Sequence, residues 1–174
     1  MSLERSGVVT MQGRPLDLLG PELKVGDEAP DFTAVDRQWK GVSLSDHAGK
    51  VVLISAVPSI DTGVCSMQTK RFNQEAAGLP EDVVLITISQ DLPFALDRFC
   101  GAEGVDRLLV LSDHVDAQFG GSYGVLIKGM RLLARSVWVI GRDGRIAYVQ
   151  IVPELTDHPD YDAALAAARQ AASA

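Results

Sequence analysis

VVLISAVPSIDTGVC, residues 51–65, joins an apolar run to one of the two cysteines of the chain. The run Val51–Val57 is short and rich in β-branched residues, which predicts a buried strand. Asp61 and Thr62 then offer N-cap side chains, and residues 67–77 are mostly helix formers. Cys65 is therefore expected in the first turn of a helix, at the carboxyl end of a buried strand.

That position suits a reactive thiol. Unpaired backbone N–H groups and the positive end of the helix dipole both favour thiolate over thiol. A buried cysteine is more often a small apolar packing residue, but three features favour a nucleophile: the turn before Cys65, the Thr62 hydroxyl three residues upstream, and a second cysteine at position 100. Pro58 ends the strand without offering an N–H and can shield the site from water.

The elements around this stretch predict an α/β fold. A second apolar strand at Val83–Ser89 completes a strand–helix–strand unit, which is typical of a parallel sheet. A hairpin with Gly13 at its turn is expected at the N-terminus, about residues 8–18, and a second hairpin of antiparallel strands near the C-terminus makes the sheet mixed. The other predicted elements are the strand 108–111, the helices 94–100, 115–123 and 159–172, and the hairpin strands 135–140 and 145–151.

Cys100 falls at the end of the predicted helix Phe94–Cys100, which starts after Pro93 and stops near Gly101. So short a helix is marginal by itself and is stabilised mostly by packing, so it can open at modest cost.

Composition bounds the kind of protein. The chain has 174 residues, of which 47% are apolar and 22% charged, which fits one soluble domain spanning residues 1–174. A net charge of −7 argues against nucleic acid or anionic membranes as partners. No apolar run approaches the roughly 20 residues of a membrane helix, and the N-terminus lacks the apolar core of a signal peptide. We therefore expect a cytoplasmic protein, in which a transient disulfide would be functional.

No metal or cofactor is expected. The two cysteines lie too far apart in sequence for a common zinc motif, and His47, His114 and His158 are scattered, so we predict surface positions for the histidines. Trp39 and Trp138 are predicted to be core or interface residues.

Several motifs together resemble one family. They are PSIDTGVC (58–65), SQDLPFALDRFCGAEG (89–104), LSDH (111–114), YGVLIKGMRLLARSVWVI (123–140) and DHPDYDAAL (157–165). In this order and spacing they are similar to thiol peroxidases, the atypical two-cysteine peroxiredoxins, over nearly the whole chain. The resemblance implies a thioredoxin-like fold, a central mixed sheet flanked by helices, and reduction of hydrogen peroxide and alkyl hydroperoxides with electrons from thioredoxin.

The resemblance also implies roles for individual residues. Cys65 corresponds to the peroxidatic cysteine and Cys100 to the resolving cysteine, which together form an intramolecular disulfide. Pro58 and Thr62 complete the family's P-x-x-x-T-x-x-C motif, and Arg135 corresponds to its active-site arginine. Without the resemblance, Arg135 fits a solvated charge at a strand edge equally well.

Other functions remain open at this stage. A thioredoxin-type disulfide oxidoreductase is disfavoured, since it needs a C-x-x-C motif and position 62 is threonine. A thioredoxin-like binding domain with inert cysteines, or a redox sensor that relays oxidation to a partner, would use the same fold. We also expect a homodimer, and the apolar stripe within 126–133, in a predicted loop, is a candidate for the substrate pocket or the dimer contact.

Overall fold

The computed structural model describes residues 3–174 and contains two sheets. The larger, seven-stranded sheet is mixed, in the order β10-β9-β5-β6-β7-β3-β4. β5 pairs parallel to β6 and β6 parallel to β7, whereas β9 runs antiparallel to β5. The strands are β3 (Thr33–Val35), β4 (Gly41–Ser43), β5 (Val51–Ala56), β6 (Val83–Ser89), β7 (Leu109–Ser112), β9 (Ser136–Ile140) and β10 (Ile146–Ile151).

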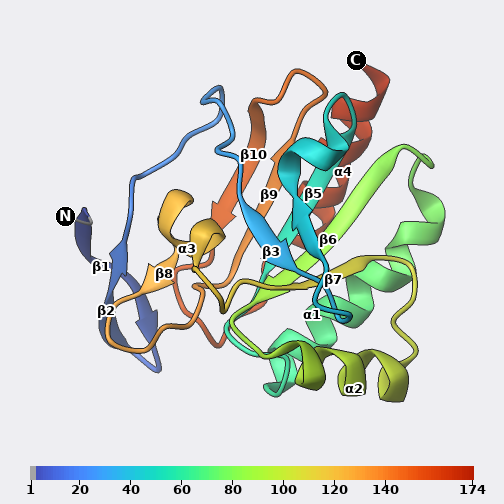
Figure 1. Ribbon diagram of the computed structural model, residues 1–174. Coiled ribbons are helices and arrows are strands. Elements are labelled where there is room, and N and C mark those ends of the chain that lie inside the picture. Colours follow the sequence, from blue (N-terminus) through green and yellow to red (C-terminus); the bar gives the residue numbers. More distant parts are fainter. Residues whose placement is uncertain (1–2) are drawn as a thin grey trace.

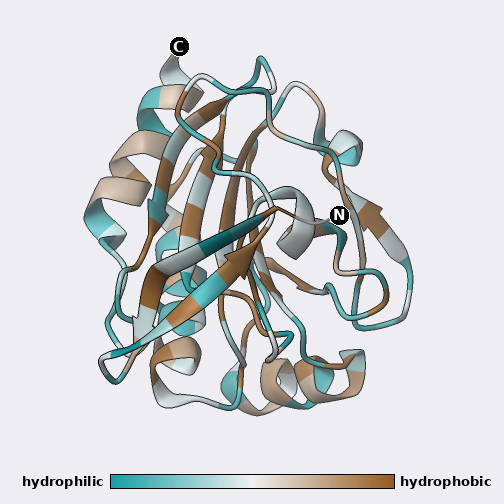
Figure 2. Ribbon diagram, turned by 90° about the vertical axis from the view of Figure 1, so that its left-hand side faces the viewer, coloured by the Kyte–Doolittle hydropathy of each residue, from teal (hydrophilic) through white to brown (hydrophobic). Residues whose placement is uncertain are grey.

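The predicted N-terminal hairpin is confirmed. β1 (Glu4–Met11) pairs antiparallel with β2 (Arg14–Leu19), and both turn residues, Gln12 and Gly13, have positive φ. This combination belongs to the two-residue turn that matches the twist of paired strands. β2 also pairs with the short β8 (Leu126–Ile127), which makes a second sheet of three strands. Figure 1 shows this hairpin to the left of the larger sheet, and Figure 2, seen from that side, shows it crossing in front of the sheet.

Alternate residues of the central strands supply two cores, one on each face of the larger sheet. Val51 and Leu53 pack with α1 (Gly63–Glu75) and α4 (Tyr161–Ser173), whereas Val52 and Ile54 pack with the hairpin and α3 (Gln118–Ser122). Because side chains alternate across a strand, a nearly continuous apolar run such as β5 is typical where both faces are covered.

Three sequence predictions need correction. α2 spans Pro93–Glu103 rather than 94–100, because the left-handed C-cap is Gly104 (φ 67°) and not Gly101. Cys100 therefore lies inside the helix and not at its end. The helix predicted at 115–123 shrinks to α3, since Ala117 before it has a left-handed backbone that a helix cannot include.

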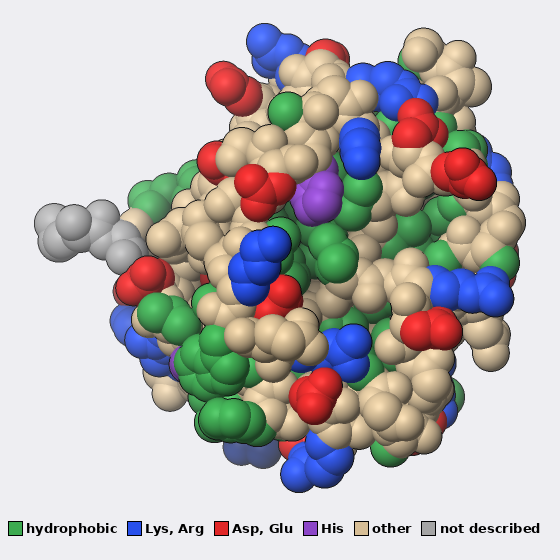
Figure 3. Space-filling model, turned by 45° about the vertical axis from the view of Figure 1, so that its right-hand side comes forward, with side chains coloured by type: hydrophobic (Ala, Val, Ile, Leu, Met, Phe, Trp, Pro, Cys, Tyr) green, Lys and Arg blue, Asp and Glu red, His purple; other side chains and the backbone are tan. Residues whose placement is uncertain are grey.

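The stripe 126–133 is only partly the predicted loop, because it begins as a strand and continues through an exposed turn at 128–131. It contains β8, and Ile127 and Leu133 are completely buried in the core. The two tryptophans differ in burial: Trp138 is buried against Tyr123, while Trp39 is 46% exposed. His158 is exposed, and His47 and His114 are half-buried. Figure 3 shows acidic and basic side chains interspersed over one face of the molecule.

Candidate active site

Cys65 lies in the first turn of α1, where the sequence predicted it. Thr62 is the N-cap of this helix, and its Oγ1 accepts a hydrogen bond from the Cys65 backbone N–H at 3.4 Å. The thiol itself is completely buried. The Thr62 hydroxyl hydrogen is not used in this contact, so it remains available to a substrate oxygen.

Arg135 reaches the same thiol from the segment just before β9. Its side chain is only 2% exposed, and Nη2 donates to Cys65 Sγ at 3.4 Å. Nε and Nη2 also donate to the Leu155 carbonyl at 3.0 and 2.8 Å. This burial excludes the solvated strand-edge interpretation of Arg135. The guanidinium cannot lose its proton, so it presents a permanent positive charge to the sulfur.

Gln68 is a site residue that the sequence reasoning missed. It is completely buried on α1, and its Oε1 accepts a hydrogen bond from Arg135 Nη1 at 3.0 Å. Its Nε2 donates to Ser55 Oγ on β5 at 2.7 Å. The available signal was its position three residues after Cys65, which places both side chains on one face of the helix. Gln68 and Leu155 together hold the guanidinium in place against the thiol.

A pocket of about 370 Å³ opens beside these residues. Three residues singled out from the sequence, Pro58, Thr62 and Arg135, lie in its wall. The rest of the wall is mainly apolar and comes from several elements far apart in the sequence: Met11, Val64, Met67, Leu132 and Leu155. Leu132 is thus the member of the apolar stripe that lines this pocket.

Met11 reaches the pocket because the hairpin is tied down at its turn. The Glu154 carboxylate accepts hydrogen bonds from the Gly13 backbone N–H at 2.9 Å and from the Thr10 hydroxyl at 3.0 Å. With further hydrogen bonds from Thr156, these lower the pKa of Glu154 to about 2. The hairpin is therefore fixed as one wall of the pocket.

Cys100 has separate, apolar surroundings. It is 4% exposed and packs in a cluster with Ile60, Leu96, Val105 and Val110. Burial raises the pKa of the Cys100 thiol, and the positive charge of Arg37 partly opposes this. Both cysteines are free thiols in the structure. Cys100 is thus held neutral in a small core of its own, away from the charged group that faces Cys65.

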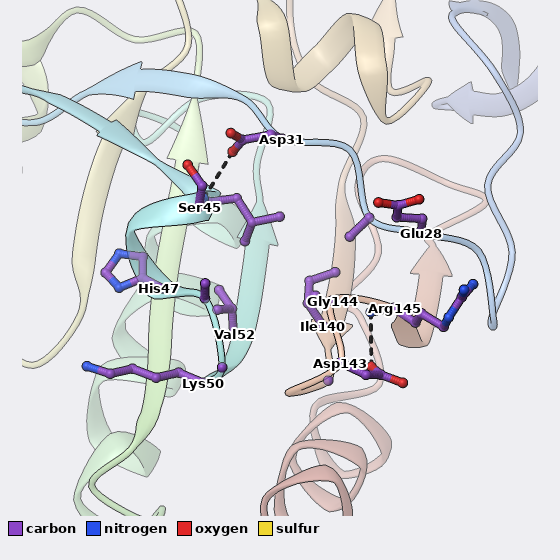
Figure 4. A pocket seen from close by; sticks show the side chains of 15 residues that line it. Glu28, Asp31, Ser45, His47, Lys50, Val52, Ile140, Asp143, Gly144 and Arg145 are labelled. Atoms are coloured by element: carbon purple, nitrogen blue, oxygen red, sulfur yellow. Dashed lines mark hydrogen bonds between the residues drawn. The ribbon is translucent and has the colours of Figure 1, made fainter.

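A second pocket, of about 330 Å³, lies at the opposite end of β5 from Cys65. Figure 4 shows Val52 and Ile140 on its two sides, with Lys50 and Arg145 pointing away from each other. His47 Nε2 is buried here without a hydrogen-bond partner, and burial lowers the pKa of this imidazole. It shares no lining residue with the pocket beside Thr62 and Arg135, so it is separate from the thiol site.

A thioredoxin-like sheet that carries a buried thiol at a helix N-terminus, faced by an arginine, defines a thiol-based redox enzyme. Comparison with known proteins narrows this class. The Redoxin family model matches residues 24–165. The thiol peroxidase of Listeria innocua is 55% identical over 94% of this chain and 98% of its own, and that of Bacillus subtilis is 53% identical over 92% and 96%.

A solved structure gives the same result. The peroxiredoxin-like protein from Aquifex aeolicus superimposes with a TM-score of 0.89 at 39% identity and covers 98% of both chains. The chain therefore belongs to the Redoxin family, as one of its peroxiredoxins of the thiol peroxidase type. Its activity is that of a thiol-dependent peroxidase. Within residues 3–174, no helix is both long and apolar enough to cross a membrane.

Proposed function

We propose that Cys65 is the peroxidatic cysteine and Cys100 the resolving cysteine of this enzyme. The Cys65 thiolate attacks one peroxide oxygen, the O–O bond breaks, and the other oxygen leaves as water or an alcohol after taking up a proton. Cys65 becomes a sulfenic acid. The observation that carries this assignment is the hydrogen bond from buried Arg135 Nη2 to Cys65 Sγ.

The surroundings of Cys65 suit the charge changes of this step. Arg135 and the N-terminus of α1 stabilise the thiolate before attack, and Arg135 also faces the charge that develops on the leaving oxygen. The Thr62 hydroxyl can donate to a peroxide oxygen, and Pro58 limits the access of water. The apolar walls around Met67 and Leu132 would accept the organic group of an alkyl hydroperoxide, whereas hydrogen peroxide needs only the polar side.

Cys100 completes the cycle. Its thiol condenses with the Cys65 sulfenic acid, one water molecule leaves, and an intramolecular disulfide forms. A disulfide needs Cα atoms closer than about 7 Å and correctly aimed sulfurs. Since each thiol lies in its own buried surroundings, we propose that α2 opens locally to let Cys100 reach Cys65. Thioredoxin then reduces the disulfide by thiol exchange.

We also propose that the enzyme is a homodimer. The apolar stripe within 126–133 was one candidate for the contact, but Ile127 and Leu133 are buried, Leu132 lines the pocket, and Met130 is its one exposed member. An exposed apolar patch lies instead beside the start of α2, where Trp39 packs against Phe94 with ring centroids 5.5 Å apart. Its members are between 46% and 70% exposed: Trp39, Leu92, Phe94 and Val115. Patches of this kind on a soluble protein are typical of contact surfaces.

Single substitutions of the two cysteines test the assignment. We expect Cys65→Ser to abolish peroxide turnover, because no thiolate remains to attack the O–O bond. Cys100→Ser should keep the first oxidation but stop thioredoxin-dependent recycling, because the sulfenic acid has no partner thiol. Stopped-flow oxidation followed by peptide mapping measures both steps, and full turnover by either variant would contradict the role assigned to that residue.

A further inference from the structure

Asp91 lies in the loop between β6 and α2, one residue before the N-cap of the helix that carries Cys100. Its carboxylate accepts three hydrogen bonds. Ser59 Oγ donates to Oδ1 at 2.8 Å, and the Ile60 backbone N–H donates to Oδ2 at 2.7 Å. Ser89 Oγ, at the end of β6, donates to Oδ2 at 2.7 Å. One ionised side chain thus joins the end of β6 to a segment about thirty positions away in the sequence.

The segment that Asp91 contacts leads directly into the Cys65 helix. The Ser59 carbonyl accepts a hydrogen bond from the Thr62 backbone N–H at 3.1 Å, and Ser59 Oγ accepts one from the Asp61 N–H at 3.2 Å. Ser59 therefore shapes the turn that presents Thr62 as the N-cap. Any change in the position of Ser59 is transmitted to the first turn of α1.

The same segment also packs on α2. Ile60 is 2% exposed and belongs to the small core that contains Cys100 and Leu96. The Asp91 main chain is held as well, because Ser112 Oγ on β7 donates to the Asp91 carbonyl at 2.5 Å. The main chain of Asp91 is thus bonded to the sheet, and its carboxylate binds the segment that leads to Cys65.

We propose that Asp91 is a positioning residue that clasps residues 59–62 to the start of α2, so that the segments of Cys65 and Cys100 open together. The proposal rests on the resolving role of Cys100 proposed above. Three donors to one carboxylate make a charge-assisted cluster, which is stronger than neutral hydrogen bonds of the same geometry. Breaking the cluster releases Ile60 from α2 and loosens the packing around Cys100 in the same step.

Because of this coupling, overoxidation of the Cys65 sulfenic acid competes with formation of the Cys65–Cys100 disulfide. In the clasped state the Cys65 sulfenic acid cannot meet Cys100, so a second peroxide can oxidise it to sulfinic acid. In the open state Cys100 reaches it, the disulfide forms and water leaves. Asp91 therefore keeps Cys65 ordered for fast attack on peroxide, but it slows the formation of the Cys65–Cys100 disulfide.

Asp91→Asn tests the proposal, because the amide keeps the size of the side chain but loses its charge and one acceptor oxygen. The Ile60 N–H, which donates to Oδ2, would then face an NH₂ group. We expect amide hydrogen exchange about tenfold faster in both residues 59–66 and residues 93–100, with exchange in β5 unchanged. Disulfide formation should accelerate about tenfold, and more peroxide should be needed to overoxidise half of the Cys65 thiols.

The control is Asp106→Asn, which removes an exposed carboxylate from the loop after α2; it should leave exchange and both rates at the wild-type values. Ser59→Ala removes one of the three hydrogen bonds and serves as the second variant if Asp91→Asn does not fold. A purely structural role would raise exchange throughout the protein and leave the ratio of resolution to overoxidation unchanged.

Faster exchange in one segment alone, or an unchanged rate of disulfide formation, would overturn the proposal. If the wild-type protein forms no Cys65–Cys100 disulfide, the role of Cys100 fails. The exchange measurement would still decide whether Asp91 couples the two segments.

Discussion

Arg135→Met removes the positive charge that faces the thiol while keeping an unbranched side chain. At 3.4 Å the interaction of the guanidinium with a thiolate has a Coulomb energy of roughly 5 kcal/mol at an effective dielectric constant of about 20. Desolvation offsets part of this, and the net contribution of a hydrogen bond to a charged group is about 1.5–3 kcal/mol. The rate of Cys65 oxidation at neutral pH should therefore fall by roughly 10- to 150-fold.

The assay is stopped-flow oxidation of the reduced variant by hydrogen peroxide, with the rate constant measured at several pH values. Arg135→Lys should recover part of the rate, because it restores the charge but not the fork that binds both Leu155 and Gln68. The loss of Arg135 also leaves the Leu155 carbonyl without its donor, which should lower the free energy of unfolding by about 1–3 kcal/mol.

A control must show that a slower reaction of Arg135→Met with peroxide does not come from its lower stability. Ala168→Gly, in the buried face of α4, should destabilise the fold by about 1–2 kcal/mol without touching the thiol site. It should retain the wild-type rate of oxidation. A folded Arg135→Met protein that reacts with peroxide within threefold of the wild-type rate would refute the proposed role of the guanidinium.

Two further predictions concern stability and assembly. Burial raises the pKa of Asp113 from 3.8 to about 6. Between these pH values the folded state binds more protons than the unfolded state, so the free energy of unfolding falls as the pH rises. Above pH 6, the ionised Asp113 lowers the free energy of unfolding by about 3 kcal/mol. Urea unfolding should show wild-type stability declining, relative to Asp113→Asn, as the pH rises from 4 to 6; parallel curves would contradict this. The proposed homodimer should sediment at twice the 18.6 kDa chain mass at micromolar concentrations, and a monomeric mass there would argue against it.

The sequence predicted the elements whose signals are local. β5 is buried along its whole length and mostly apolar, because helices and the hairpin cover both faces of the sheet. The turn at Gly13 has its own backbone signature. The position of Cys65 followed from the strand before it and the candidate N-caps Asp61 and Thr62, of which the structure uses Thr62. The end of α2 was misjudged, since either Gly101 or Gly104 could end a helix and the left-handed cap falls at Gly104.

What the sequence determined by itself was the strand–helix unit that presents Cys65 and the set of residue types needed for thiol chemistry. Only the tertiary structure decided what surrounds the two thiols. Arg135 lies 70 positions from Cys65, and the Asp91 carboxylate meets Ser59 across 32 positions. Such contacts depend on how strands pair and which faces are covered, and no local propensity or periodicity encodes that partnership.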